Sequence, residues 1–303
     1  MNVTLRQLSL FESVARNLSF TRAAEELHLS QPAVSMQIRQ LEESVGLPLF
    51  EKSGKQVSLT EAGREVFHYS QGINRYLVEM EEVLVSLKGL NRGHLHVAVA
   101  STVNYFAPRL LAAFHRRYPG IDLELDVTNR EQLIQQLVAN SVDVVLMGKP
   151  PQSVEVEAEP FMRNPLVVIA PPDHPLRDQK RIPLERLAEE VFVMREPGSG
   201  TRQAMERIFD AKGLEIRRGM QMTRNEAIKQ AVRAGLGLSI VSTHTIELEL
   251  ETGRLVKLDV EGLPIERKWY LVYRKRKRMS PSSQAFRSFV IKEAESIDAM
   301  ADD

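Results

Sequence analysis

The sequence predicts a mixed α/β protein with three parts: a small helical domain ending in a β-hairpin, a long helix, and a two-lobed α/β domain. Three observations support this fold class. Residues 19–46 have the spacing of two short helices joined by a tight turn, residues 60–88 contain no proline and keep one apolar face, and short apolar strands alternate with helical segments after residue 93. The predicted domains are therefore 1–60, 61–89 and 90–303.

The segment 19–46, SFTRAAEELHLSQPAVSMQIRQLEESVG, has the pattern of a helix-turn-helix. In its second helix the apolar residues repeat at steps of four, three and four, which is the spacing of one buried face. Ser19 and Ser30 stand where N-caps belong, and Gly46 ends the second helix. An ordinary amphipathic hairpin would show the same pattern, so the helices alone leave both interpretations open.

The opposite face of the second helix carries polar groups. Gln31, Ser35 and Arg39 are four residues apart, with Pro32 and Met36 beside them. Such a helix can enter the major groove of DNA, because amide and hydroxyl groups in its first turns can bond to base edges. The segment 47–67 then indicates two extended stretches around a Ser-Gly-Lys turn and a following helix, which is the wing of a winged helix.

Residues 1–67 resemble the DNA-binding domain of LysR-type transcriptional regulators. The resemblance rests on LRQLSLFESVARNLSFTRAAEELHLSQPAVSMQIRQLEESVGLPLFEK and SLTEAGR, and in length and layout it extends over the whole chain. It implies sequence-specific binding to double-stranded promoter DNA. The residues implied to meet bases are Gln31, Pro32, Ser35 and Met36, and those implied to meet phosphates are Thr21, Arg22, Ser30, Arg39, Lys52 and Lys55.

Composition excludes several classes of function. The chain has 303 residues, 43% of them hydrophobic, and no cysteine, so disulfides and thiol-based sensing are impossible. No apolar run approaches the roughly 18 residues of a membrane span, and the N-terminus lacks the pattern of a signal peptide, so we expect a cytoplasmic protein with no membrane partner. No catalytic motif is present, and we expect no enzyme.

The net charge is zero, both for the whole chain and for residues 1–60. A domain that binds nucleic acid usually has a basic surface. We therefore expect the acidic residues Glu25, Glu26, Glu42 and Glu43 to face away from DNA, and oligomerisation to compensate for weak binding by one copy.

The segment 61–89 is predicted to be a dimerisation helix. Apolar residues recur at steps of four, three, four and three, a period of 3.5 that suits a partner helix. The alternative is a helix packed on its own domain. Resemblance to the family further suggests a tetramer built as a dimer of dimers, with RNA polymerase as a further candidate partner.

Residues 90–303 are predicted to form a two-lobed effector-binding domain resembling periplasmic binding proteins. Strands that alternate with helices imply βαβ units and parallel sheets. Because the last strand and helix are needed to complete the first half, we expect two crossovers. Lobe I then comprises 90–164 and 266–303, and lobe II comprises 165–265.

A small anionic metabolite, a carboxylate or phosphate ester, is predicted to bind between the lobes. Ligands of open α/β sheets bind beyond the carboxyl ends of the strands, and helix N-termini there favour anions. Hydroxyl, amide and glycine residues follow several of these strand ends. They are Ser101, Thr102, Gly148, Ser199, Gly200, Thr201, Arg202, Thr223, Asn225, Gly237 and Ser239.

The motifs SQPAVSMQIRQLEE and REPGSGTR resemble the CbbR-type branch of the family, which regulates carbon-fixation genes. That resemblance implies an effector such as a phosphorylated sugar, a phosphoglycerate-like acid or NADPH, and no bound cofactor. A regulator of another operon, such as one for inorganic carbon uptake, has nearly the same motifs. A cytoplasmic small-molecule-binding protein without a DNA function is the alternative from a different class.

Two further patterns are assigned no function. His94 and His96 alternate on one strand face and could ligate a metal, but no third ligand follows at a suitable spacing, so no metal site is predicted. The basic run Arg274–Arg278 is interpreted as a solvated loop, with attraction of DNA as the alternative.

Overall fold

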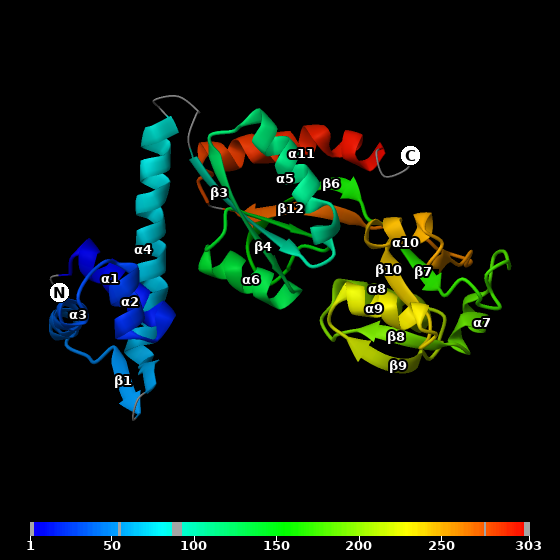
Figure 1. Cartoon of the computed structure of the whole chain (residues 1–303), viewed down its shortest axis with the longest axis horizontal. Helices are drawn as coiled ribbons and strands as arrows, with labels where there is room; N and C mark the ends of the chain where they lie inside the picture. Colours follow the sequence, from blue (N-terminus) through cyan, green and yellow to red (C-terminus); the bar gives the residue numbers. More distant parts are fainter. Residues whose placement is uncertain (1–2, 54–55, 87–92, 276, 300–303) are drawn as a thin grey trace. The chain divides into compact units, whose positions relative to one another are not determined.

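The computed structural model of the chain describes residues 3–53, 56–86, 93–275 and 277–299 (Figure 1). The chain divides into two compact units near Lys88. Within the described ranges, every helix is too short or too polar to span a lipid bilayer.

The first unit contains the predicted helix-turn-helix and hairpin. Its elements are α1 (Leu5–Asn17), α2 (Phe20–Glu26), α3 (Gln31–Val45), β1 (Phe50–Ser53), β2 (Gln56–Leu59) and α4 (Glu61–Ser86). Both predicted N-caps form, because Ser19 Oγ accepts from the amide of Arg22 at 3.3 Å and Ser30 Oγ accepts from that of Ala33 at 3.4 Å. Gly46 ends α3 in the left-handed conformation, with φ 79°.

A single apolar core holds α1, α2 and α3 together. Phe11, Val14, Ala23, Val34 and Leu41 are each 0% exposed and belong to one cluster. Their burial removes the apolar faces predicted from the sequence and leaves the polar face of α3 to solvent.

Strands β1 and β2 form an antiparallel hairpin attached to α3. Phe50 pairs with Leu59 at the base of the hairpin. The carboxylate of Glu42, on α3, accepts from the amides of Leu49 at 2.7 Å and Phe50 at 3.2 Å. Glu42, which the sequence analysis expected to face away from DNA, therefore fixes the hairpin relative to the helix.

Helix α4 presents large apolar side chains to solvent. Tyr69, Tyr76, Met80 and Leu84 are 66%, 68%, 52% and 52% exposed. Residues 87–89, the end of the predicted dimerisation segment, lie outside the described residues. Packing of this face against a partner helix stays a prediction, and the exposure of these residues is compatible with it.

The second unit begins with a five-stranded mixed sheet in the order β4-β3-β5-β12-β6 (Figure 1). These strands are β3 (Gly93–Ala100), β4 (Ile121–Thr128), β5 (Val144–Met147), β6 (Val156–Arg163) and β12 (Lys268–Arg274), and the accompanying helices are η1 (Val103–Tyr105), α5 (Ala107–Arg117), α6 (Arg130–Ala139) and α11 (Pro281–Ala299). Phe114 of α5 and Phe286 of α11 pack edge to face at 5.1 Å in its core.

The intervening chain forms a second group of strands. Strands β7 (Leu166–Ala170), β10 (Ser239–Ser242) and β11 (Val256–Lys257) form one sheet, and β8 (Val191–Arg195) pairs with β9 (Arg217–Met222). The helices of this lobe are α7 (Leu184–Ala188), α8 (Gly200–Asp210), α9 (Asn225–Arg233), η2 (Thr243–Thr245) and α10 (Glu247–Glu251). Apolar clusters on both faces of these strands hold the lobe together.

The prediction of parallel sheets is wrong for part of both lobes. Strand β12 runs antiparallel to β5 and β6, and β10 and β11 run antiparallel to β7. The crossover rule applies to successive strands of one sheet joined by a helix. Strand β12 instead enters its sheet from the other lobe, and β6, which the sequence analysis missed, continues directly into β7.

Candidate functional site

The predicted DNA-binding face of α3 is exposed. Gln31, Pro32, Met36 and Arg39 are exposed, and Ser35 is half-buried. The amide of Gln31 donates to Ser35 Oγ at 2.8 Å, so the two predicted base contacts are joined on successive turns. Amides and hydroxyls in this position match the donor and acceptor pattern of a major groove.

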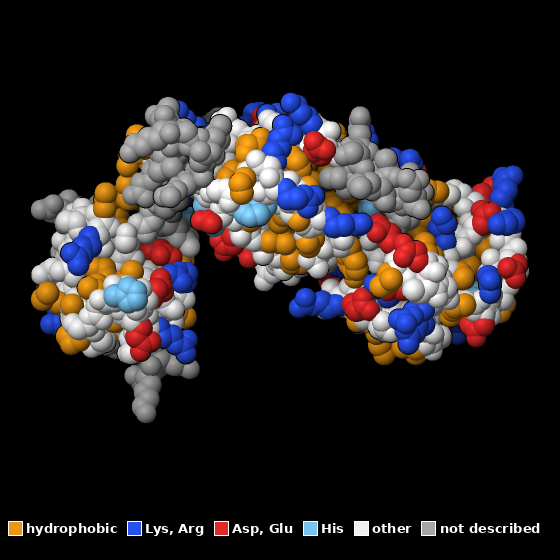
Figure 2. Space-filling view, turned by 45° about the horizontal axis from the view of Figure 1, so that its top comes forward, with side chains coloured by type: hydrophobic (Ala, Val, Ile, Leu, Met, Phe, Trp, Pro, Cys, Tyr) orange, Lys and Arg blue, Asp and Glu red, His pale blue; other side chains and the backbone are white. Residues whose placement is uncertain are grey.

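The residues predicted to meet phosphates surround this face. Thr21, Arg22 and Ser30 are exposed at the start of α2 and before α3. Lys52 belongs to β1, but its side chain and the whole of Lys55 lie outside the described residues. Figure 2 shows cationic and anionic side chains interspersed on the visible face of the molecule.

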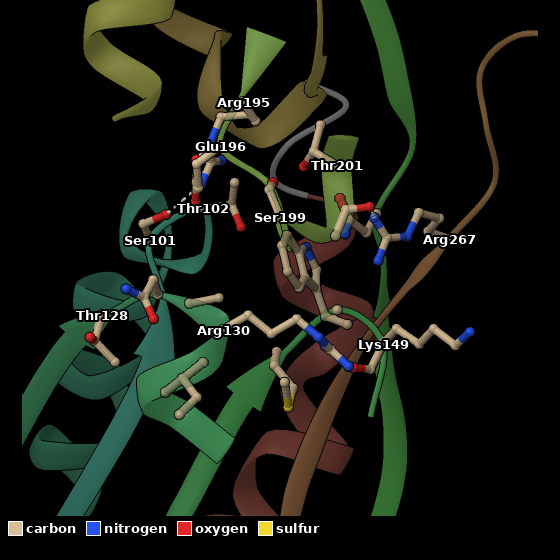
Figure 3. A pocket seen from close by; sticks show the side chains of 18 residues that line it. Ser101, Thr102, Thr128, Arg130, Lys149, Arg195, Glu196, Ser199, Thr201 and Arg267 are labelled. Carbon is tan, nitrogen blue, oxygen red and sulfur yellow. Dashed lines mark hydrogen bonds and ion pairs between the residues drawn. The ribbon is translucent and has the colours of Figure 1, made fainter. Parts of the chain in front are cut away.

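A pocket in the second unit is lined by residues of both lobes (Figure 3). It lies at the ends of β3, β4, β5 and β8 and at the start of α8. Its lining residues are Ala100, Ser101, Thr102, Thr128, Asn129, Arg130, Leu133, Met147, Gly148, Lys149, Asn164, Arg195, Glu196, Ser199, Gly200, Thr201, Arg267 and Trp269.

One side of the pocket is strongly cationic. Arg130, Lys149 and Arg267 lie near one another there (Figure 3). Burial lowers the pKa of Arg267, and the charges of Arg207 and Arg130 lower that pKa further. Burial also lowers the pKa of Arg130. Among the described residues, no carboxylate forms an ion pair with Arg130, Lys149 or Arg267, so the charge of these three is available to an anion.

Backbone carbonyls hold two of these cations in place. Arg130 donates to the carbonyl of Lys149, and Arg267 Nη1 donates to the carbonyl of Gly200 at 2.9 Å. A Cβ on Gly148 would lie 2.8 Å from Arg267 Nη2, so the absence of a side chain at Gly148 makes room for the guanidinium.

The other side of the pocket is organised by Arg195, whose side chain is 7% exposed. Its Nε and Nη2 donate to the two carboxylate oxygens of Glu196 at 2.7 and 2.8 Å, and its Nη1 donates to Asn225 Oδ1 at 2.7 Å. Its Nη2 also reaches Ser101 Oγ of the other lobe at 3.4 Å (Figure 3). Arg195 is therefore a polar link between the two lobes.

Two buried polar atoms of the lining have no hydrogen-bond partner among the described residues. They are Asn164 Oδ1, an acceptor, and Trp269 Nε1, a donor. Buried groups of this kind are rare because each costs about 1–3 kcal/mol when it stays unpaired.

Six predicted effector residues line this pocket: Ser101, Thr102, Gly148, Ser199, Gly200 and Thr201. The other predicted residues lie elsewhere. Arg202 pairs with Glu206 at 2.8 Å, and Thr223 is exposed on a bend.

Three of the predicted effector residues that do not line the pocket have structural roles instead. Asn225 accepts a hydrogen bond from Arg195 and so helps to fix that guanidinium. Gly237 has φ 139°, and a Cβ there would lie 2.4 Å from the carbonyl oxygen of Val191, so this glycine permits close backbone packing. Ser239 is 2% exposed and donates to the carbonyl of Val193 at 2.9 Å.

The sequence analysis missed the four cations of the pocket. Arg130, Lys149 and Arg195 each stand within two residues of a strand's carboxyl end, a position that the strand-end rule could have identified. Arg267 directly precedes β12, and only the antiparallel direction of that strand brings it to the same edge.

Family models match both units of the chain. The model described as the LysR substrate binding domain matches residues 88–295, and that of the bacterial regulatory helix-turn-helix protein of the lysR family matches residues 5–64. Together they cover the pocket and the exposed face of α3.

Individual relatives match over nearly the whole length. A RuBisCO operon transcriptional regulator of Allochromatium vinosum is 72% identical over 294 residues, covering 97% of each chain. The transcriptional activator CmpR of Synechocystis is 45% identical, covering 98% of this chain and 97% of the relative. A solved structure of the Synechocystis CcmR regulatory domain in complex with 2-PG is 40% identical, with a TM-score of 0.65, and covers 67% of this chain and 98% of that one.

These findings confirm the resemblance predicted from the helix-turn-helix and strand-end motifs. They also confirm similarity to the CbbR branch, since a CbbR protein of Rhodospirillum rubrum is 46% identical over 286 residues. The chain belongs to the LysR family of bacterial helix-turn-helix transcriptional regulators, where its relatives include the regulators of RuBisCO operons.

Proposed function

We propose that this regulator controls carbon-fixation genes in response to a small phosphorylated carboxylic acid. The observation that carries the effector assignment is the cluster of Arg130, Lys149 and Arg267, which have no carboxylate partner in the part of the chain that the structure describes, in a pocket shared by two lobes. The gene assignment is supported by the 72% identity to a RuBisCO operon regulator.

The pocket suits a ligand with two anionic groups. The phosphate would meet the side formed by Arg130, Lys149 and Arg267, with the free amides at the start of α8 nearby. The carboxylate would lie towards Ser101 and Thr102. Because 2-PG was found with a 40% identical domain, 2-phosphoglycolate and phosphoglycerate are the first candidates. The pocket is small, about 50 Å³, which favours such acids over the much larger NADPH.

For DNA, we assign base contacts to Gln31, Pro32, Ser35 and Met36. Thr21, Arg22, Ser30, Arg39, Lys52 and Lys55 would bind phosphates, which position the helix without reading sequence. Met36 is 55% exposed and uncharged, so it would offer an apolar surface to a thymine methyl.

The effector would act by changing how the lobes close. Arg195 already links Ser101 of lobe I to Asn225 of lobe II, and an anion bound beside it has different contacts in the open and closed forms. In a dimer paired through 61–89, and in a tetramer built from such dimers, lobe closure would reset the spacing of the DNA-binding domains and the bend of the promoter. Binding to chromosomal promoters places the protein in the cytoplasm, where RNA polymerase is a further candidate partner.

The second candidate is a regulator of inorganic carbon uptake. The 45% identity to CmpR supports it, although the identity to the RuBisCO operon regulator is higher. Footprinting on a RuBisCO operon promoter and on a bicarbonate-transport promoter separates the two assignments. Preferential protection of the transport promoter would contradict control of carbon-fixation genes.

Calorimetry tests the effector assignment. We expect 2-phosphoglycolate and phosphoglycerate to bind more tightly than glycolate, inorganic phosphate or NADPH. Arg267→Gln should weaken binding, whereas Arg233→Gln, which changes an exposed arginine of α9, should leave it unchanged. If neutral sugars bound as well as the phosphorylated acids, the proposal would be wrong.

A further inference from the structure

Two histidines and two carboxylates meet on one face of the parallel pair β3–β4. The register pairs His96 with Glu124 and Ala98 with Asp126, and His94 precedes His96 by one step of the pleat. Residues paired across strands point to the same face, so all four side chains lie together. The opposite face of both strands packs in the core. The neighbouring strand thus supplies the ligands that the sequence spacing lacked.

The donor atoms of this quartet are already close. His94 Nε2 lies 3.3 Å from Glu124 Oε2, and His96 Nε2 lies 3.0 Å from Asp126 Oδ2. Ligand atoms of His96, Glu124 and Asp126 all lie within 4.8 Å of one another. In a tetrahedral zinc site with bonds of about 2.0–2.1 Å, the ligand atoms are about 3.3 Å apart. The ligand atoms of His96, Glu124 and Asp126 are therefore close to the spacing of one ion site, and His94 lies beside them through Glu124.

A glutamine of α6 supports the arrangement from outside the quartet. Gln136 Nε2 donates to Asp126 Oδ2 at 2.9 Å, which fixes the orientation of that carboxylate. Metal-binding carboxylates are commonly held by such a hydrogen bond. His96 is also sheltered, with 18% of its side chain exposed, so a bound ion would be partly protected from water.

We propose that His96, Glu124 and Asp126 bind one divalent transition-metal ion of the Zn²⁺ type, with His94, beside Glu124, as the fourth ligand. Two imidazoles with two carboxylates select such an ion, because the hard ions Mg²⁺ and Ca²⁺ favour oxygen ligands. The site lies within lobe I and is separate from the effector pocket, whose lining contains none of the four residues. Since β4 is the edge strand of its sheet, the ion would cross-link that edge to β3.

Titration calorimetry of the full-length, chelator-treated protein with ZnCl₂ tests the site. We expect one ion per chain, and the Co²⁺-loaded protein should show visible absorption bands of tetrahedral coordination. Loss of outer-shell partners costs about 10–100-fold in metal affinity. His96→Gln and Glu124→Gln should therefore weaken Zn²⁺ binding by about 100-fold or more, and Gln136→Ala by about tenfold.

The matched control is His115→Gln, which removes an exposed histidine of α5 and should leave the affinity unchanged. Circular dichroism establishes that each variant is folded. Absence of stoichiometric binding by the wild type, or equal binding by wild type and His96→Gln, would overturn the proposal and leave the quartet as a group of ion pairs. Zn²⁺ should also raise the melting temperature of the wild type and not that of His96→Gln.

Discussion

The exposed face of α3 and the pocket of the second unit use opposite chemistry. Gln31, Pro32 and Met36 offer uncharged groups to solvent, whereas Arg195 and Arg267 hold charges away from it. DNA is a large polyanion that many peripheral cations can hold, so its base edges need only shape and hydrogen bonds. A small anion is too short to be held by many cations spread over a surface. Its binding site must concentrate cations, and some of them, such as Arg267, must be kept from pairing with carboxylates of the protein.

The two sites also differ in how they are assembled. The α3 face comes from one helix and rests on one core, while the pocket collects residues from both lobes. Substitutions in the first unit should therefore leave the effector affinity of the DNA-free protein unchanged, and substitutions around the pocket should leave effector-free DNA binding unchanged.

The largest expected effect comes from Phe11→Ala in the core of the first unit. Phe11 is 0% exposed, and its truncation should cost about 3–5 kcal/mol of unfolding free energy. Mobility-shift assays should show loss of DNA binding, while calorimetry should show unchanged effector affinity. A parallel loss of both activities would break the distinction between the two units.

Arg267→Gln should have the next largest effect. A hydrogen bond to a charged group contributes about 1.5–3 kcal/mol, so effector binding should weaken by about 10–100-fold. Calorimetry gives the affinity, and DNA binding without effector should remain at the level of the wild type. Equal affinities would mean that the cationic side of the pocket does not hold the ligand.

Gln31→Ala should relax the sequence preference of DNA binding. A good bidentate base contact contributes about 1–3 kcal/mol of discrimination, and this variant also loses the hydrogen bond to Ser35. Competition between the operator and operators with single base changes measures the loss. Effector affinity serves as the internal control, and unchanged discrimination would remove Gln31 from the set of base contacts.

Gly148→Ala should weaken effector binding by about tenfold without unfolding the protein, because the new methyl displaces the guanidinium of Arg267. A double-mutant cycle sharpens this test. In the Arg267→Gln background the same substitution should have little further effect. Additive losses would show that Gly148 acts by another route.

The smallest effect, on stability, is expected from breaking an ion pair between an arginine and a carboxylate. Arg287 Nη2 donates to Glu159 Oε2 at 2.7 Å, and hydrogen bonding from Arg287 holds the pKa of Glu159 below its usual value. The resulting stability is present above the ordinary carboxyl pKa and is lost as pH falls through the lowered one. In Glu159→Gln, the free energy of unfolding measured with urea should no longer fall with this carboxyl group as pH decreases. The difference from the wild type should be at most about 1 kcal/mol.

Local patterns in the sequence were sufficient for the first unit. The spacing of Val34, Ile38 and Leu41 fixed the buried face of α3, and the serine caps fixed its start. In the second unit, the glycine and hydroxyl residues of the pocket followed from strand ends. Arg267 did not, because its place depends on strand direction. Glu124 and Asp126 were likewise invisible as partners of His96 until the register of β3 and β4 was known.

Strand β12 sits between β5 and β6, although about a hundred residues of the other lobe separate it from them along the chain. During translation, the sheet of lobe I therefore stays incomplete until β12 has been synthesised, long after the helix-turn-helix is able to fold. A chain that stopped before β12 would contain the whole DNA-binding domain and only part of the sensor.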